Sequence, residues 1–149
     1  MEDATFGATL TLRQGYAFDV TTDRPSDRLQ VDEAPPLGGG DGPSPTRMLA
    51  TAVGHCLGAS LMFCLRKARI DVDGLEVRVE GRMTRTDAGR LRVGGLTVRL
   101  APGIPADQRQ RASRCLEIFQ DYCIVTESVR AGLDVGVIVE PVEPAPALA

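Results

Sequence analysis

The sequence has 149 residues, 43% of them hydrophobic and 25% charged, which is ordinary for a soluble globular fold of one domain. Its 17 basic and 20 acidic residues leave a net charge of −3, which argues against a protein dedicated to binding nucleic acid. The acidic start Met1–Thr5 lacks the basic and apolar regions of a secretory signal. We therefore expect a cytoplasmic protein with reduced cysteines.

The first third of the chain alternates apolar and polar residues with a period of two. This pattern predicts strands at 5–12 and 16–20, a turn at 13–15 between them, and a short third strand at 29–31. One polar face per strand indicates an antiparallel sheet that is covered on one side. Residues 34–45 are rich in Gly and Pro and match no phosphate-binding motif, so we expect a plain loop there.

A long central helix is predicted from 45 to about 68. Ser44 suits the position that caps a helix, and Pro45 suits the first helical position. The run 48–65 carries no charge. We interpret it as a buried central helix and not a membrane span, because it contains polar residues and the other segments resemble soluble strands. Small residues recur every four positions and allow another backbone, from a neighbouring helix or a second subunit, to approach closely: Ala50, Gly54 and Gly58.

The second half of the chain predicts two more strands, a helix and a last strand. Strands at 75–83 and 90–100 keep their apolar residues on one face if a one-residue bulge lies at Gly94-Gly95. A helix is expected to begin near Pro105, and a valine-rich run at 133–139 is expected to form the last strand.

This order of elements predicts an α+β domain over residues 1–140, in which the long helix packs against a curved antiparallel sheet. Residues 141–149 are expected to be a flexible tail rich in Pro and Ala. The central helix needs cover on both sides, which an intertwined dimer would supply.

The four cysteines form no CxxC pair, and with His55 as the only histidine we expect no metal site. Cys56 is either a small buried residue or a reactive thiol, and it lies too far along the helix for the N-terminal dipole to act on it. A reactive Cys56 therefore needs a cation from elsewhere, because the adjacent His55 points about 100° away. Cys64 and Cys115 are assigned to core packing.

Two segments resemble the OsmC/Ohr family. The first runs from Gly42-Pro43-Ser44-Pro45 through Met48-Leu49-Ala50 to Gly54-His55-Cys56, and the second is Asp121–Val129 around Cys123. Asp71–Gly81 is also similar to the family's strand after the central helix, so the resemblance covers roughly 5–139. It implies an OsmC-like α+β fold and an intertwined homodimer with two active sites at the subunit interface.

The resemblance also implies thiol-dependent reduction of organic hydroperoxides in oxidative-stress defence. In this interpretation Cys56 is the peroxidatic thiol, which becomes a sulfenic acid. Cys123 is the resolving thiol, which forms a Cys56–Cys123 disulfide that a small dithiol such as dihydrolipoamide reduces. No cofactor, metal, nucleic acid or membrane is implied.

The family uses an Arg from the N-terminal strand turn to stabilise the thiolate, and Arg13 is our candidate for this role, with Arg24 and Arg28 in reserve. The family's acidic residue after Ser/Asn-Pro is missing, because Thr46 and Arg47 stand there. Ile124 also stands where the family often has Pro. These departures leave alternatives open: a redox sensor or apolar-ligand-binding protein without efficient peroxidase activity, or a relic with inert thiols.

Several aromatic residues either line an apolar pocket for a bulky peroxide or belong to the core. They are Tyr16, Phe18, Phe63 and Phe119, and Tyr122 beside Cys123 is equally ambiguous.

Overall fold

A three-stranded antiparallel sheet begins the chain in the computed structural model, which describes residues 4–145. Its strands are β1 (Ala8–Gln14), β2 (Ala17–Thr22) and β3 (Arg28–Val31), in the order β1-β2-β3. The predicted strands are confirmed with shifted ends, and the turn between β1 and β2 contains Gly15 at φ +57°. Every residue of β1 is exposed, so this sheet lacks cover within the single chain.

The loop after β3 is organised by a buried carboxylate. Asp32, only 4% exposed, accepts hydrogen bonds from the backbone N–H groups of Glu33 (2.8 Å), Gly39 (3.0 Å) and Asp41 (3.1 Å). The N–H of Asp41, with the others, lowers the pKa of Asp32. The glycine-rich segment therefore wraps one carboxylate and leads the chain into the central helix.

Helix α1 (Pro45–Lys67) confirms the predicted central helix. The Ser44 side chain makes no cap hydrogen bond to the backbone; its hydroxyl lies 3.2 Å from Thr46 Oγ1 and accepts from Arg47 at 3.3 Å. Within residues 4–145, α1 is the one helix whose length and apolar composition would allow it to cross a membrane. The core helix of a soluble protein can have the same length and composition. It buries a stripe of residues: Val53, Gly54, Leu57, Gly58, Leu61 and Leu65.

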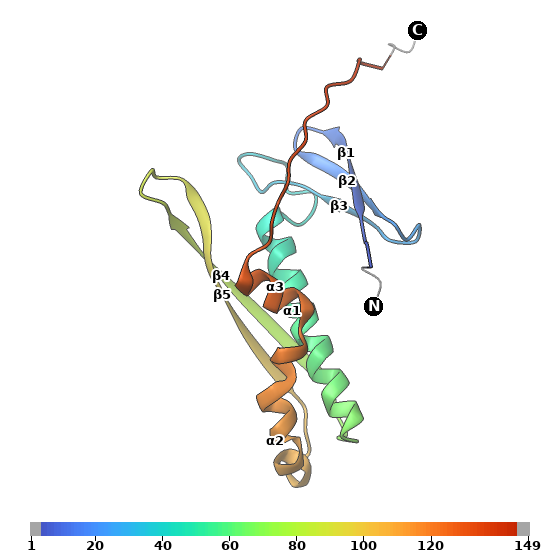
Figure 1. Cartoon of the computed structure of the whole chain (residues 1–149), viewed down its shortest axis with the longest axis vertical. Helices are drawn as coiled ribbons and strands as arrows, with labels where there is room; N and C mark the ends of the chain where they lie inside the picture. Colours follow the sequence, from blue (N-terminus) through green and yellow to red (C-terminus); the bar gives the residue numbers. More distant parts are fainter. Residues whose placement is uncertain (1–3, 146–149) are drawn as a thin grey trace.

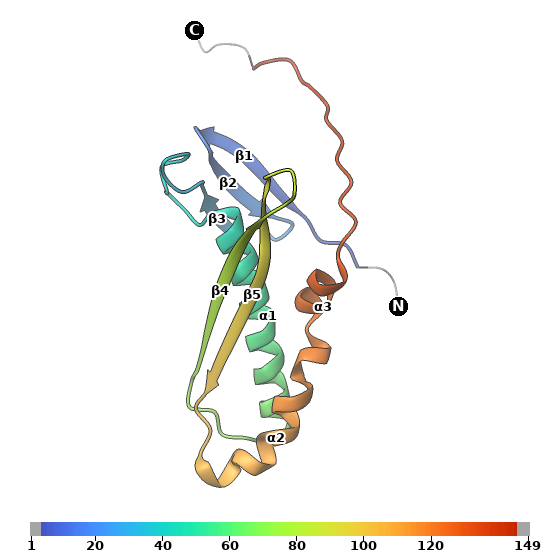
Figure 2. The same ribbon diagram turned by 90° about the vertical axis from the view of Figure 1, so that its left-hand side faces the viewer.

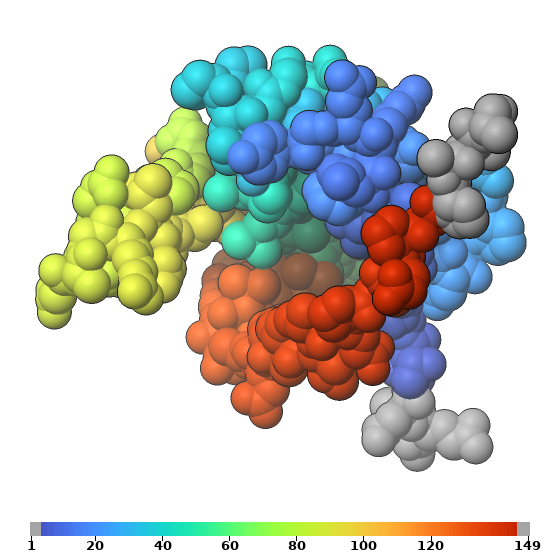
Figure 3. Space-filling view, turned by 90° about the horizontal axis from the view of Figure 1, so that it is seen from above, coloured from blue at the N-terminus to red at the C-terminus, as the bar shows by residue number. Residues whose placement is uncertain are grey.

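Strands β4 (Leu75–Arg85) and β5 (Leu91–Pro102) form a hairpin along α1. The predicted bulge is confirmed, because Arg82 pairs with Gly95 while the next residue, Met83, pairs with Val93 and leaves Gly94 unmatched. The tip of this hairpin projects from the rest of the molecule (Figure 3).

The small residues of α1 serve the contact with this hairpin. A Cβ on Gly54 would lie 2.7 Å from Val79 Cγ2, and one on Gly58 would lie 3.2 Å from Val77 Cγ2. The close approach predicted from the four-residue spacing is therefore made by β4 of the same chain.

The last third of the described chain runs back along α1. It comprises the short η1 (Ala106–Gln108), α2 (Arg109–Ile118), the short η2 (Phe119–Tyr122) and α3 (Ile124–Ala131). Figure 2 shows α1 between the β4–β5 hairpin and the α2–α3 segment, which runs antiparallel to it. The core lies along these contacts and consists of Val53, Leu57, Leu61, Leu65, Ile70, Ile104, Ala112, Cys115, Phe119 and Cys123.

The antiparallel strands form two separate sheets, of three and two strands. One expectation about the strands is wrong for this chain. The predicted last strand at 133–139 is an extended segment that pairs with no strand of the described residues. It extends away from the helices after Gly132 (Figure 1). Its apolar side chains are at least 67% exposed, because no strand within residues 4–145 lies beside it: Leu133, Val135, Val137, Ile138 and Val139. Of the predicted tail at 141–149, residues 146–149 lie outside the described part.

Candidate active site

Two cysteines from distant parts of the chain meet beside α1. Cys56 lies on α1, and Cys123 is the residue that directly precedes α3. The antiparallel course of α1 and the α2–α3 segment brings their thiols within hydrogen-bonding reach of each other. We call Cys56 and Cys123 the thiol pair.

The first turn of α3 is directed at Cys56. The backbone N–H groups of Val125 and Thr126 lie near its sulfur and act to lower its pKa. Burial and the neighbouring Cys123 act the other way, and together they raise the pKa of Cys56 above its ordinary value. In this single chain no cation is among the groups that shift this pKa.

Cys123 has the opposite shift. Burial raises its pKa, but hydrogen bonds with Cys56, Thr126 and Ser60 outweigh burial and lower it. The Cys123 thiol donates to Thr126 Oγ1 at 3.0 Å. Because the two thiols interact, they titrate as a pair. The thiolate that remains after the first proton is lost is stabilised by the thiol that is still protonated.

A surface groove of ≈ 900 Å³ makes only one of the two sulfurs accessible. Cys56 lines this groove, whereas Cys123 is fully buried beneath it. A solute entering the groove therefore meets Cys56 first. The groove is lined by Cys56, Ala59, Ser60, Phe63, Cys64, Lys67, Ala68, Arg111, Arg114, Cys115, Ile118, Tyr122 and Ile124.

The expectation that Cys64 and Cys115 are free packing residues is wrong, because a disulfide joins them and ties α1 to α2. The free cysteines are Cys56 and Cys123. The sequence held a signal for this arrangement. Cys56 and Cys64 are eight residues apart, as are Cys115 and Cys123, so two antiparallel helical segments that align one pair of thiols also align the other.

The structure does not bring Arg13 to the thiol pair. Arg13 lies at the end of β1, where its guanidinium is 3.4 Å from Asp19 Oδ1 and 3.4 Å from Gln30 Oε1. Arg47 is bonded to Ser44, and the reserve candidates Arg24 and Arg28 belong to the β2–β3 region. The role of Arg13 therefore stays a prediction that needs a second subunit.

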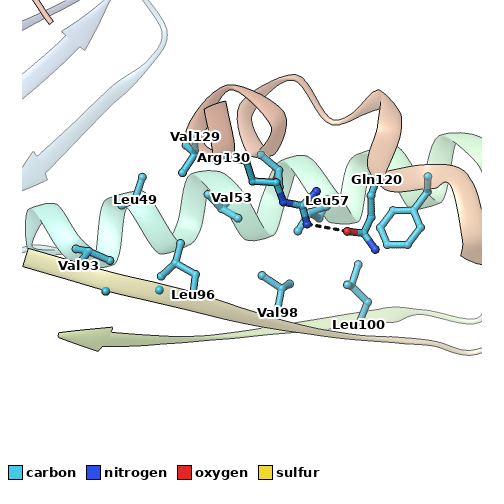
Figure 4. A pocket seen from close by; sticks show the side chains of 14 residues that line it. Leu49, Val53, Leu57, Val93, Leu96, Val98, Leu100, Gln120, Val129 and Arg130 are labelled. Carbon is cyan, nitrogen blue, oxygen red and sulfur yellow. Dashed lines mark hydrogen bonds between the residues drawn. The ribbon is translucent and has the colours of Figure 1, made fainter. Parts of the chain in front are cut away.

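The aromatic residues divide between the groove and other places. Phe63 and Tyr122 line the groove at 71% and 73% exposure. Tyr16 and Phe18 belong to the N-terminal sheet region. Phe119 lines a different pocket of ≈ 400 Å³ between α1, β5 and α3, where Arg130 donates to Gln120 Oε1 at 2.8 Å (Figure 4).

His55 lies in a third pocket, away from the groove that Cys56 lines. Within residues 4–145, no cluster of three or more His, Cys, Asp or Glu side chains could hold a metal ion.

Sequence reasoning missed two residues beside the thiol pair. Ser60 follows Cys56 by four positions, which places both on one face of α1. Thr126 follows Cys123 by three positions in the first turn of α3, where its hydroxyl reaches back to the cysteine. Both could have been found by taking the helical neighbours of each cysteine.

Comparisons with known proteins agree with this architecture. A family model described as OsmC-like protein matches residues 38–137. A search of curated proteins gives no significant match.

Solved structures share the fold at low sequence identity. An OsmC-like protein of unknown function from Vibrio cholerae is 14% identical with a TM-score of 0.72, over 85% of this chain and 94% of that protein. An OsmC-like protein from Mycoplasma pneumoniae is 14% identical with a TM-score of 0.73, over 87% and 89%. An organic hydroperoxide resistance protein from Elizabethkingia anophelis is 23% identical with a TM-score of 0.63, over 87% and 90%.

The predicted OsmC-like α+β fold is thus confirmed. The matched region contains the central helix, the β4–β5 hairpin and both members of the thiol pair, and the chain belongs to the OsmC-like protein family.

Proposed function

We propose that this protein reduces organic hydroperoxides with the thiol pair. The observation that carries the proposal is the meeting of an accessible thiol, Cys56, with a buried one, Cys123, at the first turn of α3. The name of a structural relative also supports the proposal, because the Elizabethkingia anophelis protein with this fold is an organic hydroperoxide resistance protein.

In the first step the Cys56 thiolate attacks the outer oxygen of the hydroperoxide. A sulfur–oxygen bond forms and the oxygen–oxygen bond breaks. Cys56 is oxidised to a sulfenic acid, and the alkoxide that leaves takes up a proton from solvent to become an alcohol. The N–H groups of Val125 and Thr126 favour the charged form of Cys56 on which this step depends.

In the second step the Cys123 sulfur attacks Cys56 Sγ. A disulfide forms, the sulfur–oxygen bond breaks, and the departing hydroxide is protonated to water. The lowered pKa of Cys123 suits this role, because a thiolate is the attacking species. A small dithiol such as dihydrolipoamide then restores both thiols by two exchange reactions and is itself oxidised to a disulfide.

We further propose that the working form is an intertwined homodimer. The apolar residues Leu10 and Leu12 of β1 and the extended run at 133–139 are exposed in one chain and need cover. A raised pKa leaves Cys56 mostly protonated at neutral pH, so efficient catalysis calls for a cation. Arg13, brought by a second subunit, is the candidate.

Mapping the disulfides after adding one equivalent of cumene hydroperoxide to fully reduced protein tests the proposal. We expect rapid, selective linkage of Cys56 to Cys123, loss of this linkage in Cys56→Ser, and no loss in the Cys64→Ser/Cys115→Ser control. Slow oxidation scattered over all four cysteines would overturn the proposal.

The digestion must be chosen with care. Trypsin leaves Cys56 and Cys64 together in the peptide Met48–Arg66, and Cys115 and Cys123 together in Cys115–Arg130. A tryptic digest therefore cannot distinguish the two pairings. Chymotrypsin can cleave after Phe63 and Tyr122 and separates the cysteines within each peptide.

The second candidate function is a redox sensor or a binding protein for an apolar ligand at the same site. The observation that favours it is Thr46-Arg47 in place of the expected acidic residue, together with the raised pKa of Cys56. A disulfide that forms without turnover in the presence of excess dithiol would support the sensor.

The cytoplasmic location is also a proposal. The Cys64–Cys115 disulfide counts against it, because cytoplasmic thiols are normally kept reduced.

A further inference from the structure

The Cys64–Cys115 disulfide lies in the wall of the groove, apart from the thiol pair. Both of its cysteines line the groove. Cys64 is partly exposed, whereas Cys115 is only 5% exposed, so a solute in the groove reaches the sulfur of Cys64 first. Cys64 and Cys56 are eight residues apart on α1, which corresponds to about 12 Å along the helix axis. The disulfide is therefore too far from Cys56 for direct exchange and has to be considered by itself.

Three cations surround this disulfide. Lys67 follows Cys64 by three positions on α1, which places both on one helix face. Arg111 precedes Cys115 by four positions on α2, with the same consequence, and Arg114 directly precedes Cys115. In the described part of the chain these three are the only charged residues that line the groove, and no carboxylate accompanies them. The surroundings of the disulfide are therefore positively charged, in a chain whose net charge is −3.

The charge of these cations is not neutralised by carboxylates. The ion pairs within residues 4–145 involve other arginines, namely Arg13, Arg78, Arg99 and Arg130. Arg111 donates to two neutral acceptors, the Arg69 carbonyl at 3.0 Å and Gln108 Oε1 at 3.4 Å, which fix its position and leave its charge. Positive charge beside a disulfide attracts an incoming anionic thiolate and favours the thiolate that leaves.

We propose that the Cys64–Cys115 disulfide is a second reactive site, at which a small anionic thiol exchanges with the disulfide in the folded protein. An exposed disulfide is generally a labile one, and this one is reached through the groove. The inference does not rest on the proposed function, because neither member of the thiol pair takes part.

The exchange has two steps. In the first, the thiolate of the small molecule attacks Cys64 Sγ and forms a mixed disulfide. The Cys64–Cys115 bond breaks, and Cys115 leaves as a thiolate that takes up a proton, with Arg111 one helical turn away to stabilise the charge. In the second, another small thiolate attacks the small-molecule sulfur of the mixed disulfide and releases Cys64, which is protonated to a thiol. The protein disulfide gains two electrons, and two small thiols are oxidised to their own disulfide.

The kinetics of disulfide opening test the inference in the Cys56→Ser/Cys123→Ser protein, which keeps only the other two cysteines. Three small thiols of similar size and different charge are compared: 2-mercaptoethanesulfonate, 2-mercaptoethanol and cysteamine. Each rate constant is expressed per thiolate and divided by that of the same thiol with bis(2-hydroxyethyl) disulfide, which removes the thiol's own reactivity.

At low salt we expect the normalised rate of 2-mercaptoethanesulfonate to be about three- to tenfold that of 2-mercaptoethanol, with cysteamine slowest. The differences should shrink as salt rises. The wild-type protein should rank the three thiols in the same order. Equal normalised rates for the three thiols would overturn the inference.

Charge variants locate the effect. Lys67→Gln and Arg114→Gln are each expected to slow exchange with 2-mercaptoethanesulfonate about two- to threefold and to leave exchange with 2-mercaptoethanol unchanged. Arg66→Gln is the matched control, because Arg66 neighbours Lys67 in the sequence but lines the pocket on the other side of α1. An equal loss in Arg66→Gln and Lys67→Gln would contradict the inference.

Trapping identifies the sulfur that is attacked. Glutathione, an anionic thiol, is allowed to react briefly with the Cys56→Ser/Cys123→Ser protein, and N-ethylmaleimide then blocks every free thiol. Trypsin places Cys64 in the peptide Met48–Arg66 and Cys115 in Cys115–Arg130, so each peptide holds one cysteine. We expect glutathione on Cys64 and N-ethylmaleimide on Cys115, and the reverse pattern would contradict the inference.

Urea distinguishes exchange in the folded protein from exchange after unfolding. Below the unfolding transition the rate with 2-mercaptoethanesulfonate should hardly change with urea, because the groove already exposes the disulfide. A rate that rises in proportion to the unfolded fraction would overturn the inference, since the thiol would then reach the disulfide only through global unfolding.

Discussion

At the scale of single residues, the thiol pair works through a difference between two chemically identical groups. Cys56 is accessible with a raised pKa, and Cys123 is buried with a lowered one. The first turn of α3 causes much of this difference, because its N–H groups serve Cys56 while the Thr126 hydroxyl serves Cys123. The accessible sulfur therefore depends on its surroundings to become a thiolate.

The pH dependence of Cys56 alkylation tests this account. Cys123 raises the pKa of Cys56, so Cys123→Ala should move the midpoint of alkylation by iodoacetamide to lower pH. If a second subunit supplies Arg13, Arg13→Ala should move the midpoint to higher pH, because loss of a nearby cation disfavours the thiolate. The profile is measured by mass spectrometry in a Cys64→Ser/Cys115→Ser background.

Arg78→Ala, which removes an exposed cation of β4, is the control for this experiment and should leave the midpoint where it is. If Arg13→Ala also leaves the midpoint and the rate at neutral pH unchanged, Arg13 has no role at Cys56.

At the scale of elements, sequence patterns were sufficient for most helices and strands. Alternation located the strands of both sheets, and the phase slip at Gly94-Gly95 located the bulge, because these signals are local to the chain. The strand at 133–139 failed because a strand needs a neighbour, and its apolar alternation does not say which chain supplies one.

The candidate site was less predictable than the fold. Cys56 and Cys123 were selected through a family resemblance, since nothing in their spacing alone says that they meet. The Cys64–Cys115 disulfide was missed because each cysteine was judged separately and not as part of two helices with matched spacing. The chemistry of a residue depends here on the register of its helix against another.

The disulfide between α1 and α2 should contribute strongly to stability. It closes a loop across 51 residues, for which the chain-entropy relation gives about 4 kcal/mol. We therefore expect Cys64→Ala/Cys115→Ala to lower the free energy of unfolding by roughly that amount. Urea unfolding of the oxidised proteins, followed by circular dichroism, measures the change.

Wild-type protein in excess dithiothreitol should lose a similar amount, whereas the double variant should not respond to the reductant. A double variant as stable as the oxidised wild type would show that Cys64 and Cys115 are not joined in solution.

At the scale of the whole molecule, the single chain leaves too much apolar surface in water. The N-terminal sheet exposes β1 completely. The segment after Gly132 runs away from the helices (Figure 1), and its valine side chains are exposed to solvent. Exposed surface of this extent normally marks an interface. The same incompleteness affects the site, because no cation among the described residues of one chain contributes to the pKa shift of Cys56.

We expect the protein in solution to have twice the 15.9 kDa mass of the chain. Removing residues 133–149 should weaken or abolish the dimer, because it removes the apolar run that a partner would cover. Size-exclusion chromatography with light scattering measures the mass at several concentrations.

Removing only residues 141–149 is the matched control and should leave the dimer intact. A full-length chain that stays at 15.9 kDa at all concentrations would contradict the proposed assembly.

The equal spacing of the cysteines also creates a hazard while the protein folds. Since both pairs are eight residues apart, a slip of the two helical segments by about 12 Å would align Cys56 with Cys115, or Cys64 with Cys123. Oxidation before folding is complete would then fix α1 and the α2–α3 segment two turns out of register. Protein recovered by oxidative refolding should therefore contain a cross-linked isomer that a small thiol converts to the native pairing.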